Sequence, residues 1–75
     1  MERQKIIEKF QRNEITEYNI YNKLAGRSEG KNKQILKHIS GDELRHYNVW
    51  KKYSKRNFSP NRIIVFWYLS LARIF

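Results

Sequence analysis

Two long stretches of this chain carry apolar side chains at helical spacing, and acidic residues interrupt the apolar stripe in both. The spacing predicts one amphipathic helix from about Glu2 to Ala25 and a second from about Ser28 to Lys55. The first stripe comprises Arg3, Ile6, Ile7, Phe10, Glu14, Glu17, Tyr21 and Leu24, and the second Ile35, Leu36, Ile39, Glu43, His46, Trp50 and Tyr53. A buried carboxylate is costly unless it is paired or bound to a metal ion. The two helices must therefore pack so that these acidic groups find a positive partner.

Two breaks separate three helical segments, and both contain residues typical of helix ends. The breaks are Gly26-Arg27-Ser28 and Asn57-Phe58-Ser59-Pro60. Gly26 is predicted to close the first helix in the left-handed conformation, and Ser28 to cap the second. Ser59 followed by Pro60 predicts the cap and the first position of a third helix. Gly41 weakens the second helix by about 1 kcal/mol relative to alanine, so it is predicted to serve close packing.

The third segment begins at Pro60 and is uncharged from Ile63 to Ala72. It is too short to cross a bilayer, which takes about 20 apolar residues. We expect the start of a third helix that packs in the core of a bundle; the alternative is an interfacial membrane anchor. Because the chain stops at Phe75 without a cap or a polar tail, we expect a fragment, or a helix completed by packing on another chain. The predicted fold is one all-α domain over residues 1–75, a helical hairpin plus the start of a third helix.

Length and composition limit how such a chain is stabilised. A chain of 75 residues buries only about 60 % of its unfolded surface, so its apolar core is thin. It has no cysteine, which leaves metal binding through His and carboxylates, or assembly with another chain, as further sources of stability. The N-terminus lacks the hydrophobic run of a secretory signal, so we expect a location in the cytoplasm or at the cytoplasmic face of a membrane. The net charge of +9 suits encounter with an anionic partner.

The residues that carry chemistry are predicted to meet in the seam of the hairpin. Glu43 and His46 are three residues apart, so both leave the second helix on one face and can bind one cation. Folding the hairpin antiparallel brings Glu14 to the same level. Glu17, one turn from Glu14, is either a further ligand or an acceptor beside the site. His38 and Asp42, four residues apart, are expected to pair on the helix surface instead of forming a second metal site.

At this point the residues resemble a known family. The strings FQRNEITEYNIYNKLA and GDELRHYNVWKKYS are similar to the first half of the ferritin-like di-iron carboxylate proteins, in particular the rubrerythrin branch. They look most like the ferritin-like domain that is joined, in some microbial proteins, to a membrane iron transporter of the vacuolar type. The resemblance covers about Lys9 to Lys55. It implies a four-helix bundle in which two helices each give a Glu and two each give a Glu-x-x-His.

The resemblance also implies a role for each residue. Glu14 would be a terminal ligand, Glu43 a carboxylate that bridges two metal ions, and His46 a terminal nitrogen ligand. Tyr21 would be the catalytic residue near the site and donate a hydrogen bond to a carboxylate. The implied cofactor is a di-iron centre, although manganese or zinc fits the same ligands, and the implied activity is that of a ferroxidase or related oxidoreductase that uses O2 or peroxide.

The chain holds one half of that pattern. It has no second Glu-x-x-His, and without cysteine it has no rubredoxin-like centre. A complete site therefore needs residues beyond this chain or a second copy in a homodimer. The implied partners are metal ions, an oxidant and a membrane iron transporter domain.

Two hypotheses of other classes remain open at this stage. In the first, the basic run from Lys51 to Arg56 makes the chain a helical module that binds nucleic acid or an acidic membrane surface. In the second, the chain is a structural dimerisation domain whose seam carboxylates pair with Arg3 or Lys23. The metal-binding hypothesis is preferred, and it expects no nucleic-acid partner.

Overall fold

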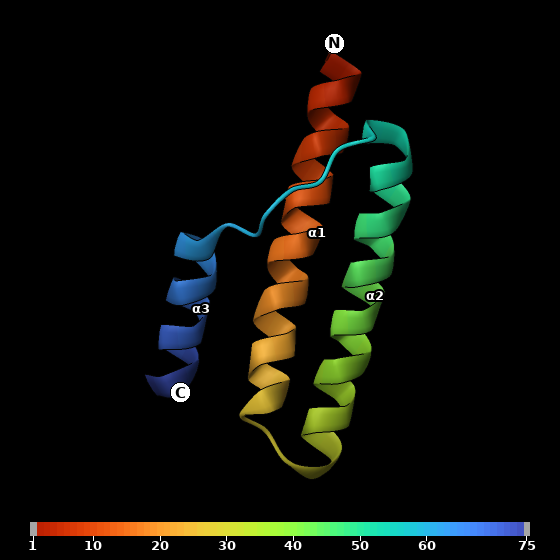
Figure 1. Ribbon diagram of the computed structural model, residues 1–75. Helices are drawn as coiled ribbons and strands as arrows, with labels where there is room; N and C mark the ends of the chain where they lie inside the picture. Colours follow the sequence, from red (N-terminus) through yellow and green to blue (C-terminus); the bar gives the residue numbers. More distant parts are fainter. Residues whose placement is uncertain (1, 75) are drawn as a thin grey trace.

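The structure is a computed structural model that describes residues 2–74, and these residues form three helices without any strand. The helices are α1 (Glu2–Gly26), α2 (Gly30–Ser54) and α3 (Arg62–Ile74). Helices α1 and α2 form an antiparallel hairpin, and α3 lies along the other side of α1 (Figure 1). Within the described residues α3 packs on α1 and has no contact with α2. The prediction of an all-α fold with a hairpin and a third helix is confirmed.

The three helices form a single layer. The described chain measures 42 × 22 × 14 Å along its principal axes, and a helix with its side chains is itself about 10–12 Å across. The radius of gyration is 13.4 Å, whereas about 11 Å is expected for a compact domain of this length. Stable domains are built from two or more packed layers, because a single layer leaves two broad faces in contact with water.

The interface of the hairpin is made of small and polar residues. Gln11 and Ala25 on α1 face Ser40, Tyr47 and Ser54 on α2, and all five are buried. Their spacing of seven or fourteen residues along each helix keeps them on one side, and the small members let the two backbones approach closely. The hairpin is thus closed by a heptad repeat of mainly polar residues, of which Ala25, Ser40 and Ser54 are small.

The large apolar residues predicted to fill this seam lie next to it. Ile6, Phe10, Ile35 and Tyr53 are 44 to 65 % exposed. For these four residues the prediction that they pack inside the hairpin is wrong, because other residues occupy the seam. Their stripe forms a neighbouring face of the same hairpin. The remaining large apolar members of the two stripes are half-buried, namely Ile7, Leu24, Leu36, Ile39 and Trp50.

The turn between α1 and α2 differs from its prediction. The Ser28 hydroxyl donates to the carbonyl of Leu24, at 2.9 Å, and so finishes α1 instead of capping α2. Glu29 occupies the N-cap position of α2 and makes no side-chain cap. Gly30, with a φ of +62°, has the left-handed backbone that was predicted for Gly26. The glycine that the turn needs is thus the one that opens α2.

The start of α3 is capped by a residue that the sequence reasoning passed over. The Asn61 side chain accepts hydrogen bonds from the N–H groups of Ile63 and Ile64, each at 3.2 Å. Asn61 is therefore the N-cap, and Ser59 and Pro60 lie before the helix in the linker.

Gly41 was predicted to serve close packing, and this is also wrong. It is exposed, and a Cβ atom added there would meet nothing within 4 Å.

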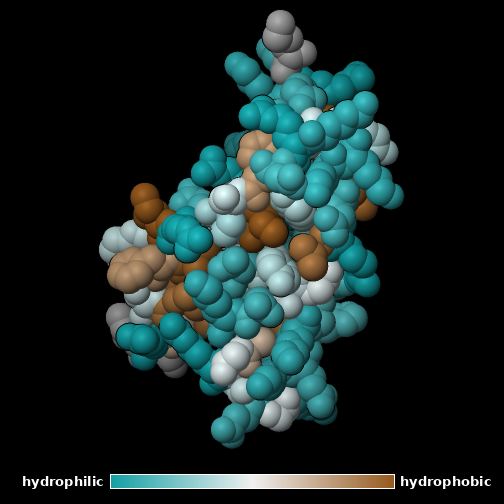
Figure 2. Space-filling model, viewed as in Figure 1, coloured by the Kyte–Doolittle hydropathy of each residue, from teal (hydrophilic) through white to brown (hydrophobic). Residues whose placement is uncertain are grey.

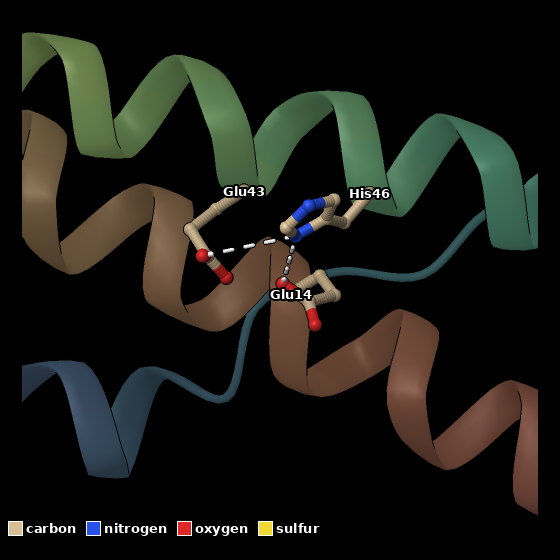
Figure 3. Close-up of side chains that lie close together, drawn as sticks. All are labelled: Glu14, Glu43 and His46. Carbon is tan, nitrogen blue, oxygen red and sulfur yellow. Dashed lines mark ion pairs between the residues drawn. The ribbon is translucent and has the colours of Figure 1, made fainter.

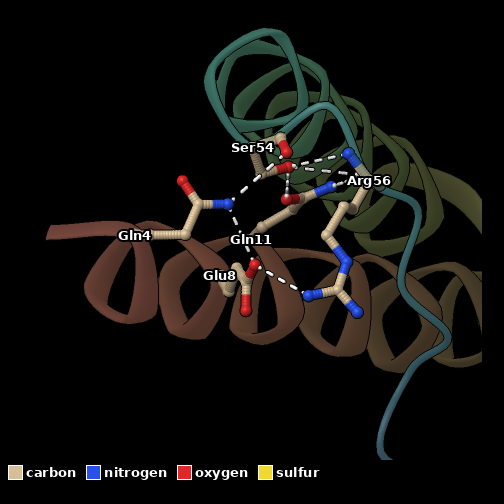
Figure 4. Close-up of polar contacts among 5 residues, drawn as sticks. All are labelled: Gln4, Glu8, Gln11, Ser54 and Arg56. Atoms are coloured by element: carbon tan, nitrogen blue, oxygen red, sulfur yellow. Dashed lines mark hydrogen bonds and ion pairs between the residues drawn. The ribbon is translucent and has the colours of Figure 1, made fainter. Parts of the chain in front are cut away.

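The linker between α2 and α3 is held against α1 by polar contacts (Figure 4). Gln11, which is fully buried, donates from Nε2 to the carbonyl of Arg56 at 2.7 Å. Arg56 also reaches back to the Glu8 carboxylate at 3.0 Å. Further along, the N–H of Asn61 donates to the Thr16 hydroxyl at 2.9 Å. These bonds fix the path of the linker over one side of α1 and so decide where α3 begins.

Helix α3 buries little of its apolar surface. Val65 is buried against α1, whereas Ile63, Phe66 and Trp67 are between 61 and 71 % exposed. Figure 2 shows this apolar surface over α3, beside the mainly hydrophilic surface of the hairpin on the same side. The expectation that residues 63–72 form a bundle core is therefore not met by the chain alone. None of the described helices is long and apolar enough to span a membrane.

Candidate metal centre

The structure brings Glu14, Glu43 and His46 together, as predicted. One donor atom from each residue lies within 4.8 Å of the other two. The Nδ1 atom of His46 is 3.4 Å from Glu14 Oε2 and 3.9 Å from Glu43 Oε1. In Figure 3 the carboxylate of Glu14 reaches from α1 toward the two α2 side chains. Local helical spacing joins Glu43 to His46, and the antiparallel hairpin adds Glu14.

The two carboxylates are sheltered and the imidazole is at the rim. The side chains of Glu14 and Glu43 are 21 % and 15 % exposed, whereas that of His46 is 57 % exposed. One oxygen of each carboxylate, Oε2, is buried without a hydrogen-bond partner. Buried oxygens of this kind are costly unless a proton or a cation joins them.

No lysine or arginine balances these carboxylates. Within residues 2–74, neither Glu14 nor Glu43 has a Lys or Arg nitrogen within 4.0 Å, and His46 is their one ion-pair partner. The hypothesis that Arg3 or Lys23 pairs with them is therefore wrong for the single chain. The cluster has an excess of negative charge that a bound cation would balance.

The protonation equilibria of the acidic groups reflect this excess. When protonated, Glu17 can donate a hydrogen bond to the carboxylate of Glu43, and this bond, then burial, then repulsion from Glu43, raises the pKa of Glu17 to about 7. Burial, followed by the hydrogen bond that a protonated Glu43 can donate to Glu14, raises the pKa of Glu43 above its usual value. Neighbouring carboxylates resist being charged together, so the metal-free cluster retains a proton near neutral pH.

Glu17 lies beside the cluster but outside the group of three donors. It lines a groove of about 380 Å³ between α1 and α3. The residues along this groove are Asn13, Thr16, Glu17, Ile20, Tyr21, Leu24, Ile64 and Tyr68. Of its two predicted positions, as a ligand or as an acceptor beside the site, the structure favours the second.

Tyr21 lines the same groove and is half-buried. Among the described residues, no hydrogen bond joins its hydroxyl to a carboxylate. The donation predicted for Tyr21 is therefore not formed in this structure, and its catalytic role stays a prediction.

Two aromatic side chains flank the cluster, and sequence reasoning did not assign them to it. Trp50 and Val49 line a shallow pocket of about 300 Å³ together with Glu14 and His46. The ring of Phe10 packs on that of Trp50 with centroids 5.5 Å apart. Their spacing in the sequence could have predicted this position, because Trp50 follows His46 by one helical turn and Phe10 precedes Glu14 by one turn.

Two further acidic residues, Asp42 and Glu8, form ion pairs outside the cluster. His38 lies 3.6 Å from Asp42, so the predicted surface pair is confirmed, and Arg45 also pairs with Asp42. In the basic run, Arg56 pairs with Glu8 and lies over the ring of Phe58 at 5.4 Å. Arg56 is thus engaged within the chain.

Two carboxylates and an imidazole are a donor set that iron, manganese and zinc all accept. Three donor residues occupy only part of the coordination shell of such an ion, so further ligands would have to come from elsewhere. No protein-family model matches this sequence, and the searches of curated proteins and of solved structures also gave no match.

Proposed function

We propose that this chain is a metal-binding protein of the ferritin-like kind, and that its activity is that of a di-iron ferroxidase or related oxidoreductase in iron handling. One observation supports the proposal above all others. Within residues 2–74, two buried carboxylate oxygens, from Glu14 and Glu43, have no hydrogen-bond partner and no Lys or Arg nitrogen within 4.0 Å, and they lie next to the His46 imidazole. A divalent cation would satisfy both oxygens and balance their charge.

The ligand count suits a pair of metal ions once a second half is present. Two copies of the trio Glu14, Glu43 and His46 would supply four carboxylates and two imidazoles. This is the set found in ferritin-like bundles, where two helices each give a Glu and two each give a Glu-x-x-His. The second half would come from residues beyond this chain or from a second copy, which would complete a four-helix bundle.

In this proposal each side chain has a defined task. Glu43, between Glu14 and Glu17, would bridge the two ions, while Glu14 and His46 would each bind one. A bound iron centre would supply the redox chemistry, which is the oxidation of Fe(II) to Fe(III) by O2 or peroxide. Trp50, packed on Phe10, covers one side of the carboxylates and limits the access of water.

The position of Glu17 suggests how the site handles protons. Its carboxyl, with a pKa raised to about 7, would hold a proton in the metal-free protein. A cation bound at Glu43 would remove the repulsion that keeps this proton in place, so that Glu17 would release it. The deprotonated carboxylate of Glu17 would then be able to accept a proton next to the metal site.

A partnership with a membrane iron transporter domain, and a location at the cytoplasmic face of a membrane, belong to the same proposal. They rest on the resemblance of the sequence from Lys9 to Lys55. The basic rival receives no support from a specific contact, since Arg56 is already bound to Glu8.

The test is metal binding by the purified chain. Titration with Mn²⁺, Zn²⁺ and, without oxygen, Fe²⁺ should show binding, and admission of air should oxidise the bound Fe(II). Glu43→Gln and His46→Ala should each weaken binding at least tenfold, because each removes a donor.

The matched controls are Asp42→Asn and His38→Ala, which change the same residue types on the same helix outside the cluster. Metal content that is the same in the two site variants as in the two controls would show that the ligand assignment is wrong.

A further inference from the structure

The two broad faces of the helical layer differ. The linker crosses one face, where it contacts Glu8 and Thr16 of α1. At 100° per residue, Glu8 lies across α1 from Glu17, and the metal cluster opens on the side of α1 away from Glu8. We name it the site face and define it by Phe10, Glu14, His46, Val49 and Trp50. On the linker side the hairpin is mainly hydrophilic (Figure 2).

A regular stripe of α2, apolar at four of its six positions, continues the site face along the helix. Its members are separated by alternating steps of four and three residues, and they are Ile35, Ile39, Asp42, His46, Val49 and Tyr53. Ile35, Val49 and Tyr53 are 52, 48 and 65 % exposed. A seam with this spacing is what one helix presents to another in a coiled coil or bundle. The hairpin itself closes on a different heptad, and within residues 2–74 Ile35, Val49 and Tyr53 remain about half exposed or more, while His46 contacts Glu14 of α1.

The whole chain, including the exposed apolar residues of α3, has more accessible surface than a compact monomer of its size. The accessible surface is 6109 Å², whereas a compact monomer of this mass, 9.2 kDa, should expose roughly 4,900 Å². The excess of about 1,200 Å² per chain matches one partner's share of a stable homodimer interface, which buries about 2,000 Å² or more in total. A second copy that covers about this area would bring the accessible surface of each chain close to that of a compact monomer of the same mass.

Charge favours a second copy over an acidic membrane as this layer. Four of the seven acidic residues of the chain, Glu14, Glu17, Asp42 and Glu43, gather at or beside the site face. Sheltered carboxylates would be repelled by anionic lipid. In a chain with a net charge of +9, these four residues reduce the net positive charge of this face.

We propose that the site face binds a second copy of this chain about a two-fold axis that passes beside His46. In this dimer the α2 stripes of the two copies pack together, and each copy adds Glu14, Glu43 and His46 to one shared centre. A two-fold interface brings the same patch of both chains together, so the rim position of His46 becomes the middle of the assembly. The shared centre rests on the metal-binding function proposed above; the interface itself does not.

The experiment is sedimentation of the full chain at several concentrations, with and without Zn²⁺. A dimer is expected, and bound Zn²⁺ should approach two ions per dimer. Val49→Glu places a charge in the seam and should raise the dissociation constant of the dimer at least 100-fold.

The matched control is Asn48→Glu, which adds the same charge to the neighbouring exposed position, 100° away around α2, and should leave the dimer intact. Ile35→Lys is a second seam variant, and circular dichroism of each variant checks that the helices remain.

The outcomes separate the two proposals. Glu43→Gln removes a metal ligand, so this variant should lose Zn²⁺ but still dimerise. Its dimerisation would support the interface independently of whether the wild type binds metal. A wild type that stays monomeric at 100-fold molar excess of Zn²⁺ and at the highest concentration tested would overturn the interface. The interface would also be overturned if the dimer had the same dissociation constant in Val49→Glu and Ile35→Lys as in the control Asn48→Glu.

Discussion

The unpaired carboxylates lead to an unusual prediction, in which one substitution stabilises the metal-free protein and destabilises the metal-loaded one. Glu43→Gln keeps the size of the side chain and removes its charge. In the metal-free protein the change relieves the buried oxygen of Glu43 and its repulsion of Glu14 and Glu17. The amide can also donate a hydrogen bond to either neighbouring carboxylate.

The magnitude follows from the exposure of the groups. Charge interactions at partly exposed positions are screened by solvent, so relief of this repulsion is worth about 1 kcal/mol of unfolding free energy. For a domain of this length that raises Tm by about 4–8 °C. Metal at 100 times its dissociation constant stabilises the wild type by about 2.7 kcal/mol, and Glu43→Gln should lose most of this gain.

The assay is thermal unfolding of both proteins at pH 7.5, with EDTA and with Zn²⁺. Asp42→Asn is the control, because Asp42 is already paired with His38 and Arg45 and its removal should not raise Tm. A metal-free Glu43→Gln protein that melts below the wild type would refute the reasoning, since it would mean that the Glu43 carboxylate has a favourable partner. Equal Zn²⁺ stabilisation of the two proteins would refute the role of Glu43 as a ligand.

Three further predictions follow from the fold and from the acidic cluster. Because the pKa of Glu17 is raised from 4.5 to about 7, the folded metal-free chain holds more protons than the unfolded one in that interval. Its Tm should therefore fall as the pH rises from 5 to 7.5, and Glu17→Gln should flatten this dependence. Gly41→Ala, at an open position inside α2, should stabilise the chain by about 1 kcal/mol in chemical denaturation, whereas Gly30→Ala should destabilise it because φ is +62°. Gln11→Ala removes the hydrogen bonds of the Gln11 side chain with the Arg56 carbonyl and the Ser54 hydroxyl and should cost about 1–3 kcal/mol, with faster amide hydrogen exchange in the linker as the local readout.

The single-layer shape explains why these effects should be large for such a small chain. Few residues are fully buried, and several of those are polar, such as Gln11, Thr16, Ser40 and Ser54. Hydrogen bonds, caps and a bound cation therefore carry a share of the stability that a larger apolar core would otherwise provide. A second layer on the site face would supply that core.

The sequence by itself determined the features that depend on local helical geometry. Periodicity predicted the three helices to within a few residues, and the step of three from Glu43 to His46 placed both on one face. The count along an antiparallel hairpin brought Glu14 to their level, and the step of four from His38 to Asp42 gave the surface pair. These features follow from the rise and turn of a helix, which do not depend on what surrounds it.

Only the tertiary structure decided which face of each helix meets which neighbour. Periodicity shows that Phe10 and Glu14 share a side of α1, but it does not show whether that side packs or stays open. The close approach of α1 and α2 selected the small residues, such as Ala25 and Ser40, because backbones pack most tightly where side chains are short. The caps and the linker depended on contacts across the chain, such as that of Gln11 with Arg56, which lie 45 residues apart and leave no local pattern.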